Sequence, residues 1–268
     1  MQVKKMQVKK YLPSLLTLAN LFLGFLSILF IQRGLFHIGC YLIVMAAILD
    51  SFDGKLARKI GVASSFGKEI DSLADLISFC LAPSFLIFNL FYDFTPIETN
   101  EFLFLYFAFF SSFPVIMGAI RLARFNIDHD MESNKNYFIG FPTPMAAITI
   151  CSLVLYKIEL GASIDMFIHL DIVILPIIIL LSFLMISKIQ FSKSLLFFSS
   201  NGNITKTLFL LFTGITVSVL AILYNYIHIA LLCFSLYYIL SNTIFHFINN
   251  SIKLNRLKNK LKKQKRVI

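Results

Sequence analysis

The sequence predicts an all-α integral membrane protein, a bundle of eight transmembrane helices with both termini in the cytoplasm. Hydrophobic residues make up 58% of the 268 residues and charged residues only 14%, whereas a soluble domain averages about 25% charged residues. Charge is also absent from several stretches long enough to cross a membrane, and Lys and Arg gather on one side of the resulting topology. We therefore expect a multi-pass protein of the cell inner (cytoplasmic) membrane.

Uncharged runs place the predicted helices in order along the chain. The hydrocarbon core of a bilayer is about 30 Å thick, and a helix needs roughly 20 residues to cross it. The first six helices are expected in the uncharged runs 11–32, 35–49, 76–92, 102–120, 139–156 and 172–187. A last uncharged run, 207–252, is too long for one span, and the polar patch 225–228 divides it into two helices.

The distribution of basic residues supports the count of eight. With eight spans, 22 of the 24 Lys and Arg residues lie on the side that holds both termini, and only Arg33 and Lys157 lie opposite. Seven or nine spans would mix these charges between the two sides. Because loops rich in Lys and Arg remain in the cytoplasm, the sequence predicts cytoplasmic termini.

The net charge of +10 is concentrated near the two ends of the chain. Residues 253–268 include eight Lys or Arg residues, and four Lys residues precede the first uncharged run. Basic clusters next to a membrane span attract anionic lipid headgroups by about 1 kcal/mol per residue. We therefore expect membrane lipids, and no nucleic acid, as partners of these ends, and one membrane domain over residues 1–268.

Four aspartates break the apolar pattern where the second predicted helix ends and the third begins. A carboxylate inside the membrane costs about 3 kcal/mol on insertion scales, so four of them require a compensating partner. At about 100° per residue, Asp50 and Asp53 share one helix face, as do Asp71 and Asp75. The two helices are antiparallel neighbours, so Asp50 can face Asp75 and Asp53 can face Asp71. Four carboxylates should converge at one depth, open to the cytoplasm.

This cluster is typical of a divalent metal site. Oxygen ligands without His or Cys select hard cations, and we expect two Mn²⁺ or Mg²⁺ ions that help a phosphate to leave. The small residues Gly54, Ala57 and Gly67 would let a nucleotide or diphosphate approach the backbone closely. A structural acid paired with a basic residue is the alternative, but Arg58 neutralises at most one of four carboxylates.

The chain resembles the CDP-alcohol phosphotransferase family, whose signature it matches without departure: Asp50-x2-Asp53-Gly54-x2-Ala57-Arg58-x8-Gly67-x3-Asp71-x3-Asp75. The resemblance implies that Asp50, Asp53 and Asp71 hold metal. It implies that Asp75 completes the second metal site and acts as general base. It also implies that the CDP pocket is lined by Gly54, Ala57, Arg58 and Gly67.

Further motifs resemble the bacterial, membrane-integral members of the family that use serine as the acceptor. These motifs lie in the first helix around Thr17 and Asn20, after the fourth helix at 121–126, and at the start of the fifth helix at 141–144. The resemblance implies CDP-diacylglycerol and L-serine as substrates, release of CMP, and a homodimer. It makes residues 11–200 the family core, 207–252 two additional helices and 253–268 a basic cytoplasmic tail.

Polar residues in these motifs divide between the two substrates. Thr17 and Asn20 are expected to contact the CDP-lipid. Arg121 and Arg124 could bind the serine carboxylate or the lipid phosphate, because a guanidinium group pairs with either anion. Further polar contacts to serine or to the lipid phosphate are expected from Asn126 and Thr143.

Three alternatives remain open at this point. The same chemistry could use glycerol 3-phosphate, inositol phosphate or choline, although a phosphate-bearing acceptor would favour more basic residues around the pocket. A divalent-cation transporter could use the acidic cluster, although such sites lie near the bilayer midplane on broken helices. A non-catalytic membrane scaffold would tolerate the loss of Asp75.

Overall fold

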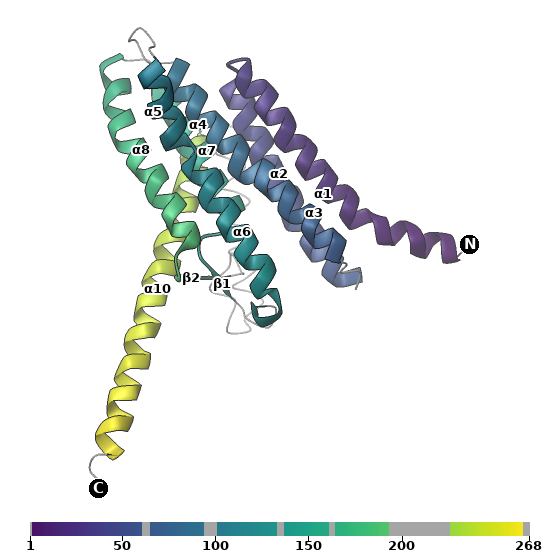
Figure 1. Ribbon diagram of the computed structural model, residues 1–268, viewed down its shortest axis with the longest axis vertical. Coiled ribbons are helices and arrows are strands. Elements are labelled where there is room, and N and C mark those ends of the chain that lie inside the picture. The colour runs from purple at the N-terminus through teal and green to yellow at the C-terminus, as the bar shows by residue number, and fades with distance from the viewer. Residues whose placement is uncertain are drawn as a thin grey trace.

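The computed structural model describes residues 2–60, 65–93, 101–132, 137–160, 164–192 and 226–264, and most of them are helical (Figure 1). Within these ranges, four helices are long and apolar enough to cross a membrane: Ser14–Gln32, Phe66–Tyr92, Glu101–Ile127 and Ile227–Ile248. The prediction of a helical membrane protein is therefore confirmed. The helix expected at 207–224 lies outside the described residues.

Helices α1 (Gln2–Gln32) and α2 (Phe36–Ile60) form an antiparallel pair that packs along most of its length. A tight turn joins them at Gly34, whose φ of +75° is one that residues with a side chain rarely adopt. One face of α1 carries Leu18, Phe22 and Phe25, each at least half exposed. Large apolar side chains on the outside of a membrane bundle face lipid, so the opposite face of α1 is the one that meets the protein interior.

Helices α3 (Ser65–Asp75) and α4 (Ala82–Asp93) form one continuous rod, joined by the π-helical turn η1 (Leu76–Leu81). A π turn contains an extra residue, which changes the direction of the side chains that follow, and such turns are frequent at functional sites. Both α1 and another helix, α6, pack against η1. Asp71 and Asp75 therefore lie in the C-terminal part of α3, directly before the π-helical turn.

The span expected at 102–120 is formed by two helical segments, α5 (Glu101–Ser111) and α6 (Phe113–Glu132), which together make up the membrane-length stretch Glu101–Ile127. The interruption falls just before Pro114, whose ring lacks an N–H and clashes with the preceding turn. Helix α6 then continues past residue 126, so the motif at 121–126 lies inside a helix and not after one. Hydropathy detects only the part of a helix that is in lipid, which explains the difference.

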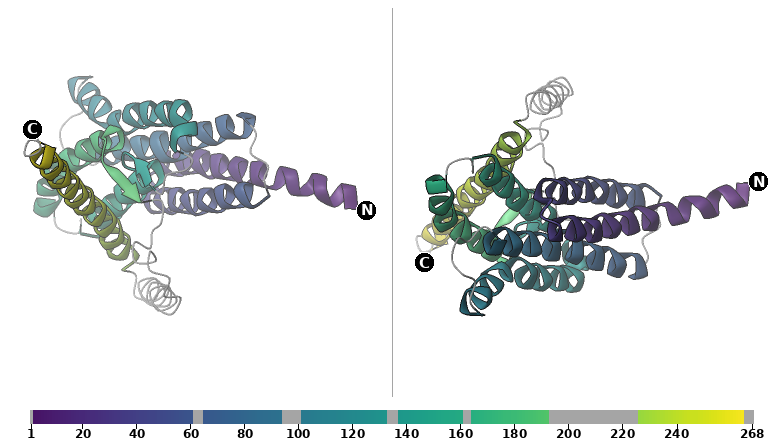
Figure 2. Two further views of the ribbon diagram at one scale, coloured as in Figure 1. Left: turned by 90° about the horizontal axis from the view of Figure 1, so that it is seen from below. Right: turned by 90° about the horizontal axis from the view of Figure 1, so that it is seen from above.

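The second half of the protein is arranged around α7 (Thr143–Leu160), which packs against α2, α4, α8 (Ile164–Ile186) and α10 (Ile227–Gln264). Side chains such as those of Ile150 and Leu155 are almost completely buried there. In Figures 1 and 2, the C-terminal half of α10 and the first turns of α1 extend beyond the bundle in different directions.

A short antiparallel ribbon lies between these helices, formed by β1 (Tyr137–Ile139) and β2 (Gln190–Ser192), with Phe138 opposite Phe191. The uncharged run begins at residue 139, but the structure has strand and turn up to Pro142, and the helix starts within the motif at 141–144 as expected. Gly140, at a φ of +83°, approaches the backbone of Met185 so closely that a Cβ would collide with it. A side chain at that position is therefore excluded, and helix α7 begins only after Pro142.

Candidate active site

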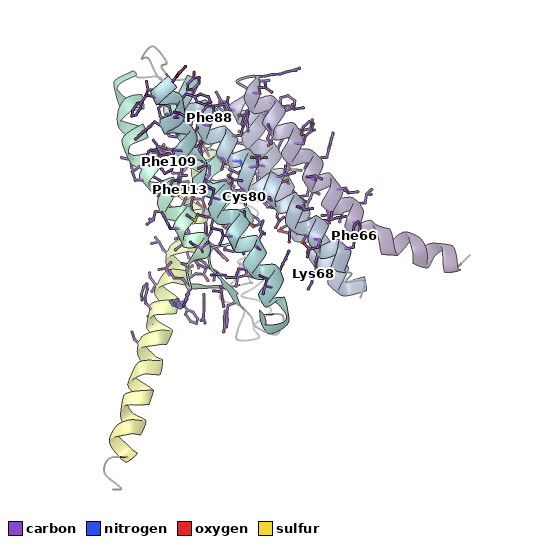
Figure 3. The ribbon with its side chains drawn as sticks, in the orientation of Figure 1. Phe66, Lys68, Cys80, Phe88, Phe109 and Phe113 are labelled. Atoms are coloured by element: carbon purple, nitrogen blue, oxygen red, sulfur yellow. The ribbon has the colours of Figure 1, made fainter. Side chains whose placement is uncertain are left out.

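Three of the predicted carboxylates meet between α2 and α3. One oxygen each from Asp50, Asp71 and Asp75 lie within 4.8 Å of one another, and all three side chains are partly buried. Asp71 and Asp75 share a helix face because they are four residues apart, and Asp50 comes from the facing helix. The sequence places Asp50 opposite Asp75 alone, whereas the structure brings it close to both acids of α3. Lys68 and Cys80, which are labelled in Figure 3, bracket the stretch of the rod that contains Asp71 and Asp75 in the sequence.

The cluster has the chemistry of a cation site. Asp71 Oδ1 is buried and has no hydrogen-bond partner among the described residues, and a buried oxygen of this kind is costly unless something pairs with it. Three carboxylates at this separation also repel one another strongly where water is scarce. The donors are all carboxylate oxygens, which suit a hard divalent ion such as Mg²⁺ or Mn²⁺. The residues present therefore fit a divalent metal.

Four signature residues lie on the last turns of α2, where the structure describes the backbone but not the side chains: Asp53, Gly54, Ala57 and Arg58. Asp53 follows Asp50 by three residues in the same helix. Gly67 lies in the first turn of α3 and is partly buried. These signature residues therefore lie near the C-terminal end of α2 and the N-terminal end of α3.

Helix α1 contributes Asn20, which lies against the acidic cluster. Its Nδ2 donates a long hydrogen bond of 3.5 Å to Asp75 Oδ1, and its backbone oxygen accepts a bond of 3.0 Å from Ser78 Oγ in η1. The close approach depends on Gly24, because a Cβ there would collide with Ser78. Thr17, one turn earlier on α1, is also buried.

Helix α6 contributes two arginines with different environments. Arg121 is buried, its Nη1 donates to Thr143 Oγ1 at 3.1 Å, and it attracts Asp75 electrostatically. Arg124 donates from Nη1 to the Ile186 oxygen at 3.1 Å and from Nη2 to the Ile139 oxygen at 3.3 Å. These bonds connect Arg124 to the ribbon and the end of α8, whereas Arg121 is beside the acids.

Asn126 joins α6 to α3 through two side chains that the sequence did not single out. Asn126 Oδ1 accepts a bond of 3.0 Å from Ser72 Oγ, and Asn126 Nδ2 donates to Glu69 Oε2 at 3.4 Å. The signature leaves positions 69 and 72 open, so no motif marks them. Their only signal is that both stand on α3 within a few residues of the aspartates.

Comparison with known proteins agrees with this geometry. A sequence model of the CDP-alcohol phosphatidyltransferase family matches residues 10–184, which include every residue of the acidic cluster. A CDP-diacylglycerol–serine O-phosphatidyltransferase of Helicobacter pylori is 39% identical over 67% of this chain and 70% of its own length. An archaetidylserine synthase of Methanothermobacter thermautotrophicus is 36% identical over 68% of this chain and 70% of its own length.

A third relative is a CDP-diacylglycerol–serine O-phosphatidyltransferase of Bacillus subtilis, 34% identical over 53% of this chain and 75% of its own length. The family match covers more than half of the chain, and the first relative matches over more than two thirds of it. On these grounds the chain belongs to the CDP-alcohol phosphatidyltransferase family.

Proposed function

We propose that the protein makes phosphatidylserine by transferring the phosphatidyl group of CDP-diacylglycerol to L-serine, with release of CMP. The observation that carries the proposal is the convergence of Asp50, Asp71 and Asp75 within 4.8 Å, in a chain of this family. The names of the relatives support serine as the acceptor. Glycerol 3-phosphate, inositol phosphate and choline are the acceptors against which the assay below discriminates.

In the proposed reaction, the serine hydroxyl oxygen attacks the phosphorus that carries diacylglycerol. Asp75 takes the hydroxyl proton, a new phosphorus–oxygen bond forms, and the bond to CMP breaks. Asp50, Asp53, Asp71 and Asp75 would hold two Mn²⁺ or Mg²⁺ ions. Bound metal would supply positive charge against the diphosphate and against the charge that develops on CMP.

The remaining signature residues are assigned by their positions. Gly54, Ala57, Arg58 and Gly67 would receive the CDP part of the lipid, and Thr17 would lie on its path. Arg121, supported by Thr143, is placed to bind an anionic group near Asp75. Asn126 would fix α6 against α3, and Arg124, with two donors on backbone oxygens, has a mainly structural role.

The proposed setting is the inner membrane, with eight spans, cytoplasmic termini and the acidic cluster open to the cytoplasm. The acyl chains would stay in lipid while serine enters from the cytosol. Residues 11–200 would form the catalytic core, 207–252 two further helices and 253–268 a basic tail at the lipid surface. We further propose a homodimer, which chemical cross-linking in native membranes would test.

The experiment is a synthesis assay with the purified full-length protein in detergent micelles. CDP-diacylglycerol, isotope-labelled serine and Mn²⁺ should give labelled phosphatidylserine, and addition of a chelator should stop the synthesis. Parallel reactions with labelled glycerol 3-phosphate, inositol phosphate and choline test the other acceptors. The proposal is refuted if serine gives no lipid product while another acceptor does. It is also refuted if the protein carries Mn²⁺ into proteoliposomes but forms no phospholipid product with any acceptor.

A further inference from the structure

The side-chain amide of Asn20 is fully buried, and of its two polar atoms the nitrogen has a hydrogen-bond partner in Asp75. Its Nδ2 donates to Asp75 Oδ1, and its exposed fraction is 0%. Because a carboxylate only accepts hydrogen bonds, the nitrogen of the amide must face Asp75, so the oxygen faces away from it. That oxygen, Oδ1, is buried and has no hydrogen-bond partner among the residues that the structure describes. A buried carbonyl without a donor destabilises the fold, so a donor from a bound molecule is the natural complement.

The position of this oxygen identifies which part of the reaction it serves. The bond from Ser78 to the Asn20 backbone and the missing side chain of Gly24 hold α1 at the depth of Asp75. Gly67, in the expected CDP pocket, precedes Asp75 by eight residues, which is about 12 Å along a helix. Asn20 therefore lies at the level of the general base and not at that of the cytidine.

The chemistry of the candidate ligands narrows the choice further. A diphosphate has no N–H or O–H donor at neutral pH, and a metal ion, which the carboxylates would hold, donates no hydrogen bond. The serine hydroxyl gives its proton to Asp75 in the proposed reaction, which leaves the ammonium group as the donor. We propose that Asn20 Oδ1 accepts a hydrogen bond from the ammonium group of the acceptor, and so selects an amino alcohol; this inference rests on the proposed function.

Arg121 offers the matching partner for the other charged group of an amino acid. It is 7% exposed, and within the described part of the chain its Nε has no hydrogen-bond partner. Helices α1 and α6 both pack against η1, which directly follows Asp75. A zwitterionic acceptor would satisfy the unpaired oxygen of Asn20 with its ammonium group and the unpaired nitrogen of Arg121 with its carboxylate. Choline has no N–H donor, and glycerol 3-phosphate and inositol phosphate carry hydroxyl donors only.

The test compares serine with 3-hydroxypropionate, which is serine without its ammonium group. The purified full-length protein is assayed with CDP-diacylglycerol and Mn²⁺, and 3-hydroxypropionate is added as a competitor of serine. In the wild-type protein, its inhibition constant should exceed the KM for serine by roughly 10- to 100-fold, the usual effect of one charged hydrogen bond. In Asn20→Ala, the KM for serine should rise by a similar factor while the inhibition constant stays within about twofold.

Ser27→Ala is the matched control. Ser27 is buried on the same helix, and its hydroxyl donates to the Gly24 oxygen of α1 itself. This variant should leave both constants unchanged. The KM for CDP-diacylglycerol should not change in either variant, and Mn²⁺ binding without lipid, measured by electron paramagnetic resonance, should remain at the wild-type level.

Several results would overturn the inference. If both constants rise together in Asn20→Ala, Asn20 only positions Asp75, and if the KM for CDP-diacylglycerol rises, Asn20 is a CDP-lipid ligand. Weaker Mn²⁺ binding would make it a metal ligand. If Asn20→Ala does not fold, the wild-type comparison decides, because equal binding of serine and 3-hydroxypropionate also refutes the idea. A wild-type protein that makes no phosphatidylserine refutes the proposed function instead.

Discussion

Replacing Gly24 with Ala should separate α1 from the catalytic rod. A Cβ on Gly24 would lie 2.8 Å from Ser78 Cα and 2.9 Å from Ser78 Cβ, whereas carbon atoms in contact prefer about 3.5–4.0 Å. The obstacle includes backbone, so rotation of a side chain cannot relieve it. Helix α1 must therefore move away from η1 by about 1 Å to restore a normal contact.

That movement acts on the acidic cluster through Asn20. The bond from Asn20 to Asp75 is already 3.5 Å long, and an added 1 Å would break it. A displacement of about 1 Å in a catalytic site can cost roughly 100-fold in rate, and overpacking costs about 1–3 kcal/mol of stability. We expect kcat/KM for serine in Gly24→Ala to fall about 100-fold, together with a lower temperature of thermal unfolding.

Gly39→Ala in α2 is the matched control for this prediction. A Cβ at Gly39 would meet Ile31 Cγ1 at 2.5 Å and Cδ1 at 3.1 Å, so this variant also crowds the interior of the α1–α2 pair, but against a buried side chain other than Ser78. Phosphatidylserine synthesis and thermal unfolding are measured for both variants in the same detergent. Wild-type activity in Gly24→Ala, or an equal loss in Gly39→Ala, would refute the argument that the contact with Ser78 positions Asp75.

Three further predictions follow from the described contacts. Asp75→Asn should keep CDP-diacylglycerol binding, measured by calorimetry, but lower kcat by about 10²–10⁴-fold because the general base is lost; normal turnover would remove Asp75 from that role. Asp71→Asn should weaken Mn²⁺ binding by more than about 10-fold, a loss that is already typical of residues that only contact a metal ligand. Mn²⁺ binding is measured by electron paramagnetic resonance, and an unchanged affinity would contradict a metal at this oxygen. Arg124→Gln should lower stability by about 2 kcal/mol, since it removes the bonds to Ile139 and Ile186; a raised KM for serine with unchanged thermal unfolding would show instead that Arg124 contacts substrate.

The helical part of the fold could be predicted because lipid imposes a simple condition on the sequence. A span must satisfy its own backbone hydrogen bonds and remain apolar over about 20 residues, and this condition can be read from charge alone. It carries no information on how a helix continues outside lipid. The extension of α6 through residue 126 was therefore not predicted, whereas the start of α7 at Thr143 falls within the motif at 141–144 that was expected to begin the fifth helix.

The acidic cluster could be predicted for a related reason. The positions of Asp71 and Asp75 on one face follow from helical periodicity. The short segment between residues 60 and 65 predicts that α2 lies beside the rod that carries them, and in the structure α2 packs against η1 and α4 of that rod. Their convergence with Asp50 needs no knowledge of distant contacts. The η1 turn could not be predicted, because nothing in residues 76–81 distinguishes a π turn from an ordinary helical turn.

The different environments of the two arginines of α6 could not be predicted from the sequence. Arg121 and Arg124 are three residues apart on one helix, and the sequence offers both as partners for a substrate anion. The structure separates them, because the bend at Gly140 brings β1 beside β2 and presents two backbone oxygens to Arg124. These oxygens belong to residues 15 and 62 positions away in the chain, so no local pattern could indicate them. Arg121, one turn earlier on the helix and attracted to Asp75, retains a buried nitrogen that no described residue pairs with, and it is the arginine whose loss should affect serine binding.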